Sequence, residues 1–434
     1  MPTDIADTSS EGALTVIGMP WKATDAMKER TKFVLEWERR WNEAEGGHIN
    51  MAELCRMHGI TRQTGYKLVN RYKQANHSLE AVAERSRRPN TSPDALPVEV
   101  EDAIAAARKK WPKWGPRKLR RKLVEFNPGM RVPAASTIAK VLKRRGLTQP
   151  RRRRRRAPAP AGVTAPFSGC DAPNAVWCID FKGWFLTADG RRCYPLTLLD
   201  AFSRFLLRCE ALLEPDGKHV RSILDSAFVE YGLPAAIRSD GGPPFASTGP
   251  ARLTELSVWL LRLGIRVEII APGKPQQNGR LERLHRNIEE ETTEPPTADC
   301  AAQQRRFDPW RHQWNVERPH ESLKLRTPAS VYTASSTHYP RPLINPIDED
   351  PNPFSYVTRI DKSGHILWHR RRVLISSALR HEYVELDLRE QGGGWDVRWG
   401  AIHLGHLDDL RRERGLITPS RRRGAKEVSA MSLL

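Results

Sequence analysis

The sequence predicts a multidomain α+β protein. Two N-terminal helical modules precede an α/β core with a mixed five-stranded sheet, and a small β-barrel follows. Three observations support this fold class. Helical stripes with turn and cap signals fill the first 150 residues, strands alternate with helices between residues 166 and 335, and short strand-like runs follow residue 350. A length of 434 residues suffices for several domains.

The composition excludes some protein classes. A content of 39% hydrophobic and 28% charged residues is typical of a soluble globular chain rather than an acidic, solvating or membrane-integral one. No apolar run reaches the roughly 18 residues of a membrane span, and residues 1–18 lack the pattern of a signal peptide. We expect these 18 residues to be a disordered leader. The six cysteines form no C-x-x-C pair, which favours a reducing cytosol.

The positive charge is concentrated in one segment. The whole chain has a net charge of +20, and residues 108–156 contain 20 Lys and Arg against one acid, Glu125. A basic block of this density favours a polyanion partner, because each phosphate that Lys or Arg neutralises releases counterions. The alternative is a solvated charged face or a disordered basic linker.

The first module, residues 19–75, is predicted to be a helix-turn-helix domain. Two helical stretches are joined at Gly59 and Ile60, and Thr61 is placed to cap the second helix. That helix would enter the major groove of DNA with its N-terminal side chains on the bases. The residues expected to contact DNA are Arg62, Gln63, Thr64 and Lys67. A plain helical hairpin remains the alternative. A zinc site at Cys55 and His58 is excluded because a second ligand pair is missing.

A second helix-turn-helix domain is predicted over residues 95–149, followed by a basic linker over residues 150–165. In the second module we expect Lys118 and Arg121 to contact DNA. The linker opens with six arginines, which repel one another and require anions nearby. We expect all six to bind DNA: Arg151, Arg152, Arg153, Arg154, Arg155 and Arg156.

The core, residues 166–335, has the pattern of a mixed sheet. Three strands in hairpin succession are expected over residues 176–187, 191–200 and 204–213. A helix, a fourth strand, a second helix, a fifth strand and a long third helix follow up to residue 291. Antiparallel strands followed by βαβ units produce a mixed sheet with helices on its faces.

The remainder is predicted to be a small β-barrel over residues 350–410 and a basic, disordered tail over residues 411–434. Short strand-like runs separated by turn residues indicate the barrel. The tail is rich in arginine.

Three acids of the core are the candidate catalytic residues. Asp180 lies inside an apolar strand, Asp240 ends a strand before two glycines, and Glu282 lies one turn into a helix. Three neighbouring carboxylates repel one another and lose solvation, so their burial requires cations. Oxygen-only ligation suits Mg²⁺ or Mn²⁺, and two such ions can hold the attacking and leaving oxygens of a phosphodiester in line. We expect Asp180 to bridge both ions, and Asp240 and Glu282 each to complete one.

These residues stand in motifs of a known family. Residues 175–330 resemble the catalytic core of the retroviral-integrase and DDE-transposase superfamily, which has a ribonuclease-H-like fold. The motifs are W-x-x-D at 177–180, LDAFSR at 199–204, IRSDGG at 237–242, APGKPQQNGRLERLHR at 271–286 and N-x-x-RPHESL at 315–323. The paired N-terminal modules and the small barrel resemble those of bacterial insertion-sequence transposases.

The resemblance implies that Asp180, Asp240 and Glu282 are the DDE triad. The second gap, 41 residues, is a few residues longer than is common in the superfamily, and we place the surplus near STGPAR at 247–252. Gly241 also departs from the family, in which asparagine usually follows the second aspartate.

Neighbours of the triad are candidate DNA contacts. Asn278 and Arg286 lie one helical turn on either side of Glu282, so the three share a face. Lys182 lies two residues beyond Asp180 on the same strand face. The alternatives are a helix cap for Asn278 and a surface ion pair for Arg286. We expect His285 and His320 to be structural.

The sequence therefore predicts a Mg²⁺- or Mn²⁺-dependent transposase that binds the terminal inverted repeats of an insertion sequence. It would cleave and join DNA strands as a homodimer or larger assembly in the bacterial cytoplasm, associated with the nucleoid. No activated nucleophile of a serine or tyrosine recombinase is present. Two alternatives remain: a DNA-binding regulator or domesticated remnant, which Gly241 favours, and a nuclease without strand transfer.

Overall fold

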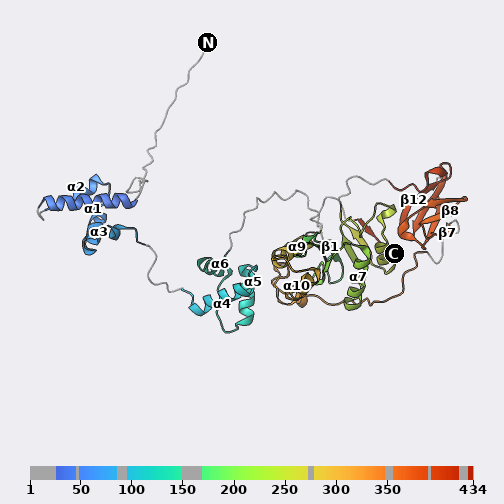
Figure 1. Cartoon of the computed structure of the whole chain (residues 1–434), viewed down its shortest axis with the longest axis horizontal. Helices are drawn as coiled ribbons and strands as arrows, with labels where there is room; N and C mark the ends of the chain where they lie inside the picture. The colour runs from blue at the N-terminus through green and yellow to red at the C-terminus, as the bar shows by residue number, and fades with distance from the viewer. Residues whose placement is uncertain are drawn as a thin grey trace, which may run out of the picture. The chain divides into compact units, whose positions relative to one another are not determined.

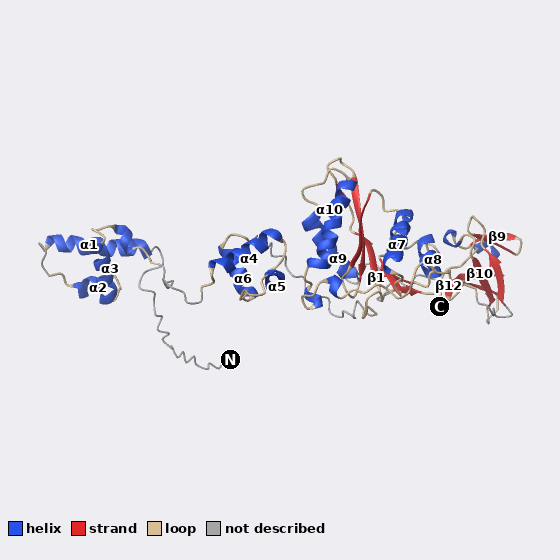
Figure 2. Cartoon of the chain, turned by 90° about the horizontal axis from the view of Figure 1, so that it is seen from below, coloured by secondary structure: helices blue, strands red, loops and turns tan. Residues whose placement is uncertain are grey.

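The computed structural model describes residues 26–44, 48–85, 95–148, 169–271, 278–347, 355–389, 392–419 and 429–433. The chain divides into two compact units, Met1–Ala95 and Leu96–Leu434. Figure 1 gives the labels of the helices and strands, and Figure 2 gives the secondary structure. The predicted leader and the whole predicted linker, with its arginine run at 151–156, lie outside the described residues.

The first unit is a helical module built from α1 (Ala26–Glu43), α2 (Met51–Met57), α3 (Arg62–Gln74) and the short turn η1 (Leu79–Val82). Phe33, Leu54 and Leu68 belong to its hydrophobic core. The Thr61 hydroxyl accepts a hydrogen bond from the N–H of Thr64, so the predicted cap of the second helix is confirmed. A Cβ on Gly65 would overlap Cys55 Sγ, which shows how closely α3 packs on α2.

The second unit begins with another three-helix module, α4 (Val98–Lys110), α5 (Pro116–Phe126) and α6 (Ala135–Arg144). One face of each helix is apolar, and Ile104, Leu119 and Ile138 meet in a common core with no exposed surface. The exposed faces of α5 and α6 are rich in Lys and Arg.

The sheet of the core is mixed, as predicted. Its strands are β1 (Trp177–Phe181), β2 (Phe185–Leu186), β3 (Arg192–Asp200), β4 (Leu206–Leu212), β5 (Ala236–Ser239), β6 (Arg266–Ile269) and β13 (Ser429–Met431). The order is β13-β6-β5-β1-β3-β2, with β4 also paired to β3. β1 pairs antiparallel with β3 and parallel with β5. The five predicted strands are present, but the first, expected over residues 176–187, is divided into β1 and β2, and β13 adds a further strand.

Helices cover both faces of this sheet. They are α7 (Gly217–Tyr231), α8 (Glu255–Arg262), α9 (Gly279–Thr292) and α10 (Cys300–His312). Successive side chains of β1 enter different cores, because strand residues alternate between faces. Trp177 and Ile179 pack in the cluster that contains residues of α7 and α8, whereas Cys178 packs in the cluster that contains residues of α9 and α10.

Short helical turns connect these elements. They are η2 (Pro250–Arg252), η4 (Gln313–Glu317), η5 (Glu321–Leu323) and η6 (Pro328–Ser330).

The predicted C-terminal barrel is not confirmed. Strands β7 (Ser355–Arg359), β10 (Tyr383–Leu388), β11 (Gly394–Trp399) and β12 (Ile402–Asp408) form a four-stranded sheet in the order β12-β11-β10-β7. β8 (His365–Trp368) and β9 (Arg371–Leu374) pair separately, and the turns η7 (Ser377–Leu379) and η8 (Arg412–Arg414) complete the region. Within the described residues these sheets do not close. The strand pattern was predictable, but closure depends on pairings between distant strands.

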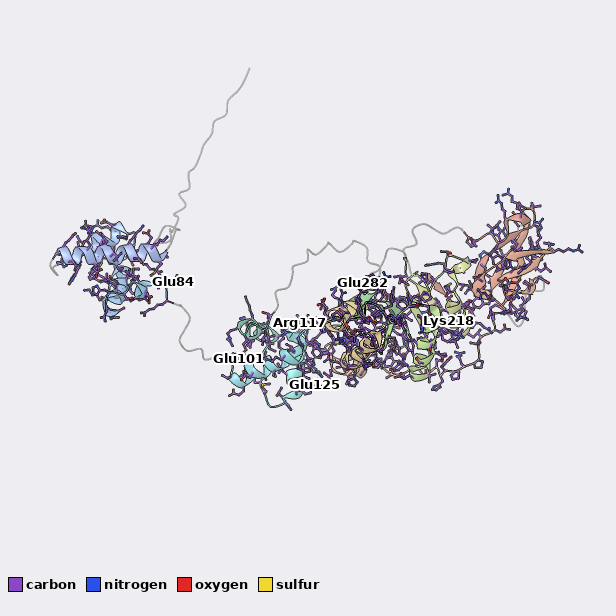
Figure 3. The ribbon with its side chains drawn as sticks, in the orientation of Figure 1. Glu84, Glu101, Arg117, Glu125, Lys218 and Glu282 are labelled. Atoms are coloured by element: carbon purple, nitrogen blue, oxygen red, sulfur yellow. The ribbon has the colours of Figure 1, made fainter. Side chains whose placement is uncertain are left out.

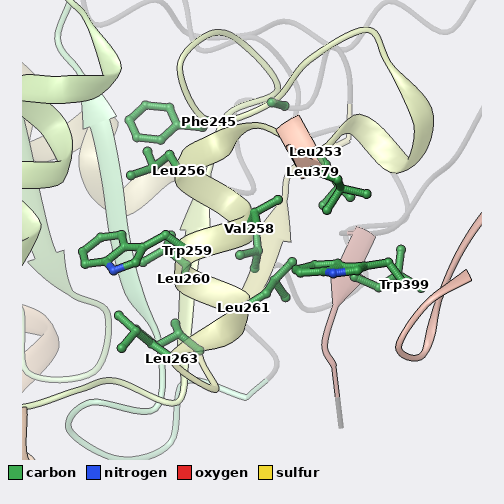
Figure 4. Close-up of a cluster of buried hydrophobic side chains, with 14 of the residues drawn as sticks. Phe245, Leu253, Leu256, Val258, Trp259, Leu260, Leu261, Leu263, Leu379 and Trp399 are labelled. Atoms are coloured by element: carbon green, nitrogen blue, oxygen red, sulfur yellow. The ribbon is translucent and has the colours of Figure 1, made fainter. Parts of the chain in front are cut away.

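Helix α8 joins the C-terminal sheets to the core. Leu256 to Leu261 are buried around the whole helix, and their hydrophobic cluster continues into Leu379 and Trp399 (Figure 4). Arg262 Nη1 lies 2.9 Å from Glu382 Oε1 across the same boundary. The C-terminal sheets and the core therefore share one hydrophobic cluster.

The predicted disordered tail contains ordered structure. Ser429 to Met431 pair antiparallel with β6 at the edge of the core sheet, although residues 420–428 lie outside the described residues. Although the tail is rich in arginine, Ser429 to Met431 form backbone hydrogen bonds with β6, which would otherwise be an open edge strand of the sheet. No helix of the described residues is long and apolar enough to cross a membrane.

Candidate active site

The pleat of β1 and the order of the sheet bring the three carboxylates together. Asp180 alternates with Ile179, so it lies on the α9 face, opposite Thr197 of β3. Asp240 directly follows β5, the parallel neighbour of β1. Leu281 and Leu284 are buried and fix the rotation of α9, which leaves Glu282 exposed in the first turn (Figure 3).

The proximity of the three carboxylates affects the pKa of Asp180. Burial, together with the like charges of the Asp240 and Glu282 carboxylates, raises its pKa from 3.8 to about 7. Because the neighbouring carboxylates repel one another when they are ionised, a bound divalent cation would stabilise their ionised forms.

The donor set fits magnesium, since all three side chains offer oxygen. Among the described residues no group of three or more His, Cys, Asp or Glu side chains is close enough to hold a single ion. The three acids are therefore neighbours, not one tight ligand cage.

A hydrogen-bonded chain connects β1, β3 and α9 behind Asp180. Thr197 Oγ1 donates to the carbonyl oxygen of Asp180 at 3.1 Å, and it lies 2.8 Å from His285 Nε2. Burial, with Lys182 nearby, lowers the pKa of His285 to about 4, so its ring is neutral near pH 7. His285 is thus structural, as expected, and its contact with Thr197 was not predicted.

Lys182 is held within the protein instead of facing solvent. Its Nζ lies 3.4 Å from Glu289 Oε2 on α9, and its side chain is only 10% exposed. The strand alternation placed Lys182 correctly on the Asp180 face, but the pairing with Glu289 depends on the position of α9. A role in DNA binding would require this ion pair to open.

Asn278 and Arg286 flank Glu282 on α9 as the spacing predicts. Asn278 is the N-cap residue, but its side chain makes no capping hydrogen bond. Its amide is buried, and neither Oδ1 nor Nδ2 has a partner among the described residues. Arg286 is exposed. The helix-cap alternative is therefore not supported by a side-chain hydrogen bond in the described residues.

An open cleft beside α9 is rich in basic side chains. Its lining includes Glu282 together with Lys113, Lys118, Arg204, Arg280, Arg283, Arg286 and Arg318, whereas Asp180 and Asp240 are not part of it. Lys118 of α5 lies in this lining, and burial and the nearby Arg318 lower its pKa to about 8. Arg121 is exposed on the same helix.

The N-x-x-RPHESL motif is structural. The Asn315 side chain bonds both the N–H and the carbonyl of Leu206, which ties the end of α10 to β4. Arg318 pairs with Glu291 of α9 at 2.8 Å. His320 is buried, and burial, Lys118 and Arg318 lower its pKa to about 3. Together these contacts support the helix that carries Glu282.

In the first unit, the four residues predicted to contact DNA are all exposed and lie in the first two turns of α3. They are Arg62, Gln63, Thr64 and Lys67. The Thr64 hydroxyl lies 2.9 Å from that of Thr61, so this side chain also contributes to the helix cap.

One residue near the triad was not predicted from the sequence. Arg252, in the STGPAR segment, donates from Nη2 to the carbonyl oxygen of Gly241 at 3.0 Å. The surplus length of the second gap and the unusual Gly241 both point to this region, but no sequence pattern predicts a contact between Arg252 and Gly241.

Known family models match most of this architecture. Two models described as "Integrase core domain" match residues 171–275 and 263–328, and a "Homeodomain-like domain" model matches residues 64–142. The mixed sheet and these matches define residues 171–328 as an integrase core domain. This part of the chain is similar to the integrase core domains of the DDE transposase and integrase superfamily.

Curated relatives come from bacterial insertion elements and retroviruses. An uncharacterized 39.2 kDa protein of insertion element IS476 from Xanthomonas euvesicatoria is 31% identical over 179 residues, 41% of this chain and 50% of the relative. An uncharacterized 31.7 kDa protein of IS407 from Burkholderia multivorans is 31% identical over 193 residues, 44% of this chain and 66% of the relative. The matched segments thus span about half to just under two thirds of these relatives.

Similar solved structures are retroviral. The catalytic core domain of the HTLV-2 integrase, in complex with magnesium, is 16% identical, with 37% of this chain and 95% of that chain covered and a TM-score of 0.27. A simian T-cell lymphotropic virus intasome in complex with a PP2A regulatory subunit is 15% identical, with 69% and 100% covered and a TM-score of 0.30.

Proposed function

We propose that this protein is a transposase that binds the ends of an insertion element, cleaves a DNA strand at each end and joins the freed 3′-hydroxyl to target DNA. The observation that carries the proposal is the effect of Asp240 and Glu282 on Asp180, whose pKa they and burial raise to about 7. DNA integration is the general activity of the superfamily, and the residues and substrates named below are part of the proposal.

The three carboxylates would hold two Mg²⁺ or Mn²⁺ ions. Asp180 would be common to both ions, Asp240 would complete one and Glu282 the other. When bound, the ions would lower the pKa of an attacking water or 3′-hydroxyl and neutralise charge on the scissile phosphate. The rigid contacts of Thr197 and His285 behind Asp180 would keep the carboxylates in place during the reaction.

Basic side chains would hold the DNA beside this centre. Arg286 and Asn278 flank Glu282, and the unpartnered amide of Asn278 offers both a donor and an acceptor to a nucleotide. Lys182 would contact DNA after release from Glu289. Lys118 and Arg121 of α5, together with the arginines at 151–156, would contact phosphates without regard to sequence.

End recognition would come from the helical modules. Arg62, Gln63, Thr64 and Lys67 would read bases in the major groove. Replacing Arg62 and Gln63 with Ala should weaken binding to the inverted repeats more than binding to unrelated DNA. Equal loss on both would assign these residues to phosphate contact. Because two DNA ends must be joined together, a homodimer or larger assembly would act, on the nucleoid of a bacterial cell.

The test is cleavage of a duplex that carries the inverted repeats flanking the gene. The wild type with Mg²⁺ should release a 3′-hydroxyl end and join it to a second duplex, and Glu282→Gln should abolish both steps. Glu214→Gln, at an exposed glutamate that does not line the cleft beside α9, is the matched control and should retain activity. Cleavage without joining would identify a nuclease, and DNA binding without cleavage a regulator or domesticated remnant.

A further inference from the structure

The loop over residues 247–252 is closed on itself next to the second carboxylate. The N–H of Ser247 donates to the carbonyl oxygen of Arg252 at 3.0 Å, and the N–H of Arg252 donates to that of Gly249 at 3.0 Å. Ala251 and Arg252 have φ angles of 48° and 60°, in the left-handed region that side chains disfavour. Such a backbone persists only where surrounding contacts hold it.

Arg252 reaches from this loop to the turn after Asp240. Its Nη2 donates to the carbonyl oxygen of Gly241 at 3.0 Å. A Cβ on Gly241 would overlap the Arg252 guanidinium, so the contact requires glycine at this position. Gly241 and the segment 247–252, where the surplus length of the second gap was placed, are thus joined by one contact through Arg252.

The same peptide group links Arg252 to the Asp240 carboxylate. The carbonyl of Gly241 accepts from Arg252, and the N–H on the other side of that peptide, from Gly242, donates to Asp240 Oδ1 at 3.2 Å. A hydrogen bond to a peptide oxygen polarises its N–H and strengthens the second bond. Arg252 therefore restricts the orientation of the peptide that holds the carboxylate.

The C-terminal sheet supports the loop from its other side. The turn η2, which ends at Arg252, packs against β12. Ala251 packs on the hydrophobic cluster that includes Leu404 and Leu407 of β12. On the exit side, Thr254 and Ser257 form a reciprocal capping box at the start of α8. The loop therefore has contacts on several sides, and the Arg252 side chain connects it to the peptide that follows Asp240.

We propose that Arg252 is a positioning residue for Asp240, acting through the peptide between Gly241 and Gly242, and that the C-terminal sheet supports this contact. The proposal rests on the proposed function in one respect, the role of Asp240 as a metal ligand.

The sign of the effect on metal binding separates positioning from simple charge. A guanidinium near Asp240 repels a divalent cation, so its removal should tighten binding if charge alone matters. If Arg252 positions the carboxylate, its removal should weaken binding, by about 10-fold as is typical of residues that orient metal ligands.

The experiment is a titration of the full DNA-free chain with Mn²⁺, followed by electron paramagnetic resonance. Arg252→Ala and Gly241→Ala should each weaken Mn²⁺ binding about 10-fold, because either change breaks the same contact. The double variant should lose no more than one single variant, since the two residues act as a unit. Arg252→Lys keeps the charge without the fork and should also lose affinity. Gly249→Ala, in the same loop, would place its Cβ in ordinary van der Waals contact with Ser247 Oγ at 3.4 Å; it is the control and should bind like the wild type.

Unchanged or tighter Mn²⁺ binding by Arg252→Ala, or additive losses in the double variant, would overturn the proposal. Thermal unfolding of each variant checks that the fold persists, and Gly241→Ala requires only the end of a flexible side chain to move. Asp240→Asn distinguishes the metal role of Asp240 from the positioning role of Arg252. If it binds Mn²⁺ as well as the wild type, the proposed metal role of Asp240 fails. If it alone loses binding, only the role of Arg252 fails.

Discussion

The Nε2 atom of His285 lies 2.8 Å from Thr197 Oγ1, although the two residues are 88 positions apart in the sequence. Because the Thr197 hydroxyl donates its single proton to Asp180 O, His285 must donate from Nε2. The ring is therefore the neutral tautomer with its proton on Nε2. This contact joins α9 to the strand beside Asp180.

Replacing Thr197 with Val tests this link. The substitution keeps the shape but removes the hydroxyl that joins the two segments and leaves the His285 N–H without this partner, so the free energy of unfolding should fall by about 1–3 kcal/mol. Urea denaturation measures the loss. Thr358→Val on β7 is the matched strand control and should change stability little. An unchanged stability of Thr197→Val would show that the two residues do not stabilise each other.

Gly65 should tolerate no side chain. A Cβ there would overlap Cys55 Sγ inside the first unit, so Gly65→Ala should cost about 1–3 kcal/mol through overpacking. Circular dichroism on heating should show earlier melting of this unit and a parallel loss of sequence-specific DNA binding. Gly129→Ala, which has no neighbour within 4 Å, should leave both unchanged. Equal melting of the two variants would contradict the close packing of α3 on α2.

The buried His320 should make the core sensitive to acid. Its pKa is lowered from 6.5 to about 3 by burial and by Lys118, Arg318 and Arg204, so the unfolded chain binds a proton more readily. The stability contributed by the neutral ring is complete above pH 6.5 and is lost as the pH falls toward 3.

His320→Phe should remove that dependence. Between pH 7 and pH 4 the wild type should lose at most roughly 3 kcal/mol more than this variant. Denaturant titrations at both pH values measure the difference. His338→Phe at an exposed site should behave like the wild type. Identical acid sensitivity in wild type and His320→Phe would contradict a neutral buried ring.

The arginine run should act as a sequence-independent clamp on DNA. Residues 151–156 lie outside the described residues, so this prediction rests on charge alone. Replacing all six with Ala and Ser should flatten the dependence of log K on log salt, by about 0.9 for each phosphate that the arginines no longer neutralise. Fluorescence anisotropy at several salt concentrations measures the slope. An unchanged slope would reduce the run to a linker.

The local pattern of the chain predicted its elements better than their contacts. Asp180 could be placed on the α9 face because strand residues alternate, and the turn signals at Gly59 and Thr61 located the first helical module correctly. The partners of Lys182, Thr197 and Arg252 could not be predicted, since each contact joins segments that are distant in the sequence. β13 was not predicted because it is held by backbone pairing with β6, and the amino-acid composition of the tail does not indicate such pairing.

The measurement that tests the central claim most directly is strand cleavage and transfer on a duplex bearing the element's ends, with Mg²⁺, by the wild type and by Asp180→Asn. We predict cleaved and joined products from the wild type, none after chelation of the metal, and none from Asp180→Asn with DNA binding intact. Products that persist in Asp180→Asn, or a wild type that binds the ends with Mg²⁺ present but never cleaves them, would contradict the proposed mechanism.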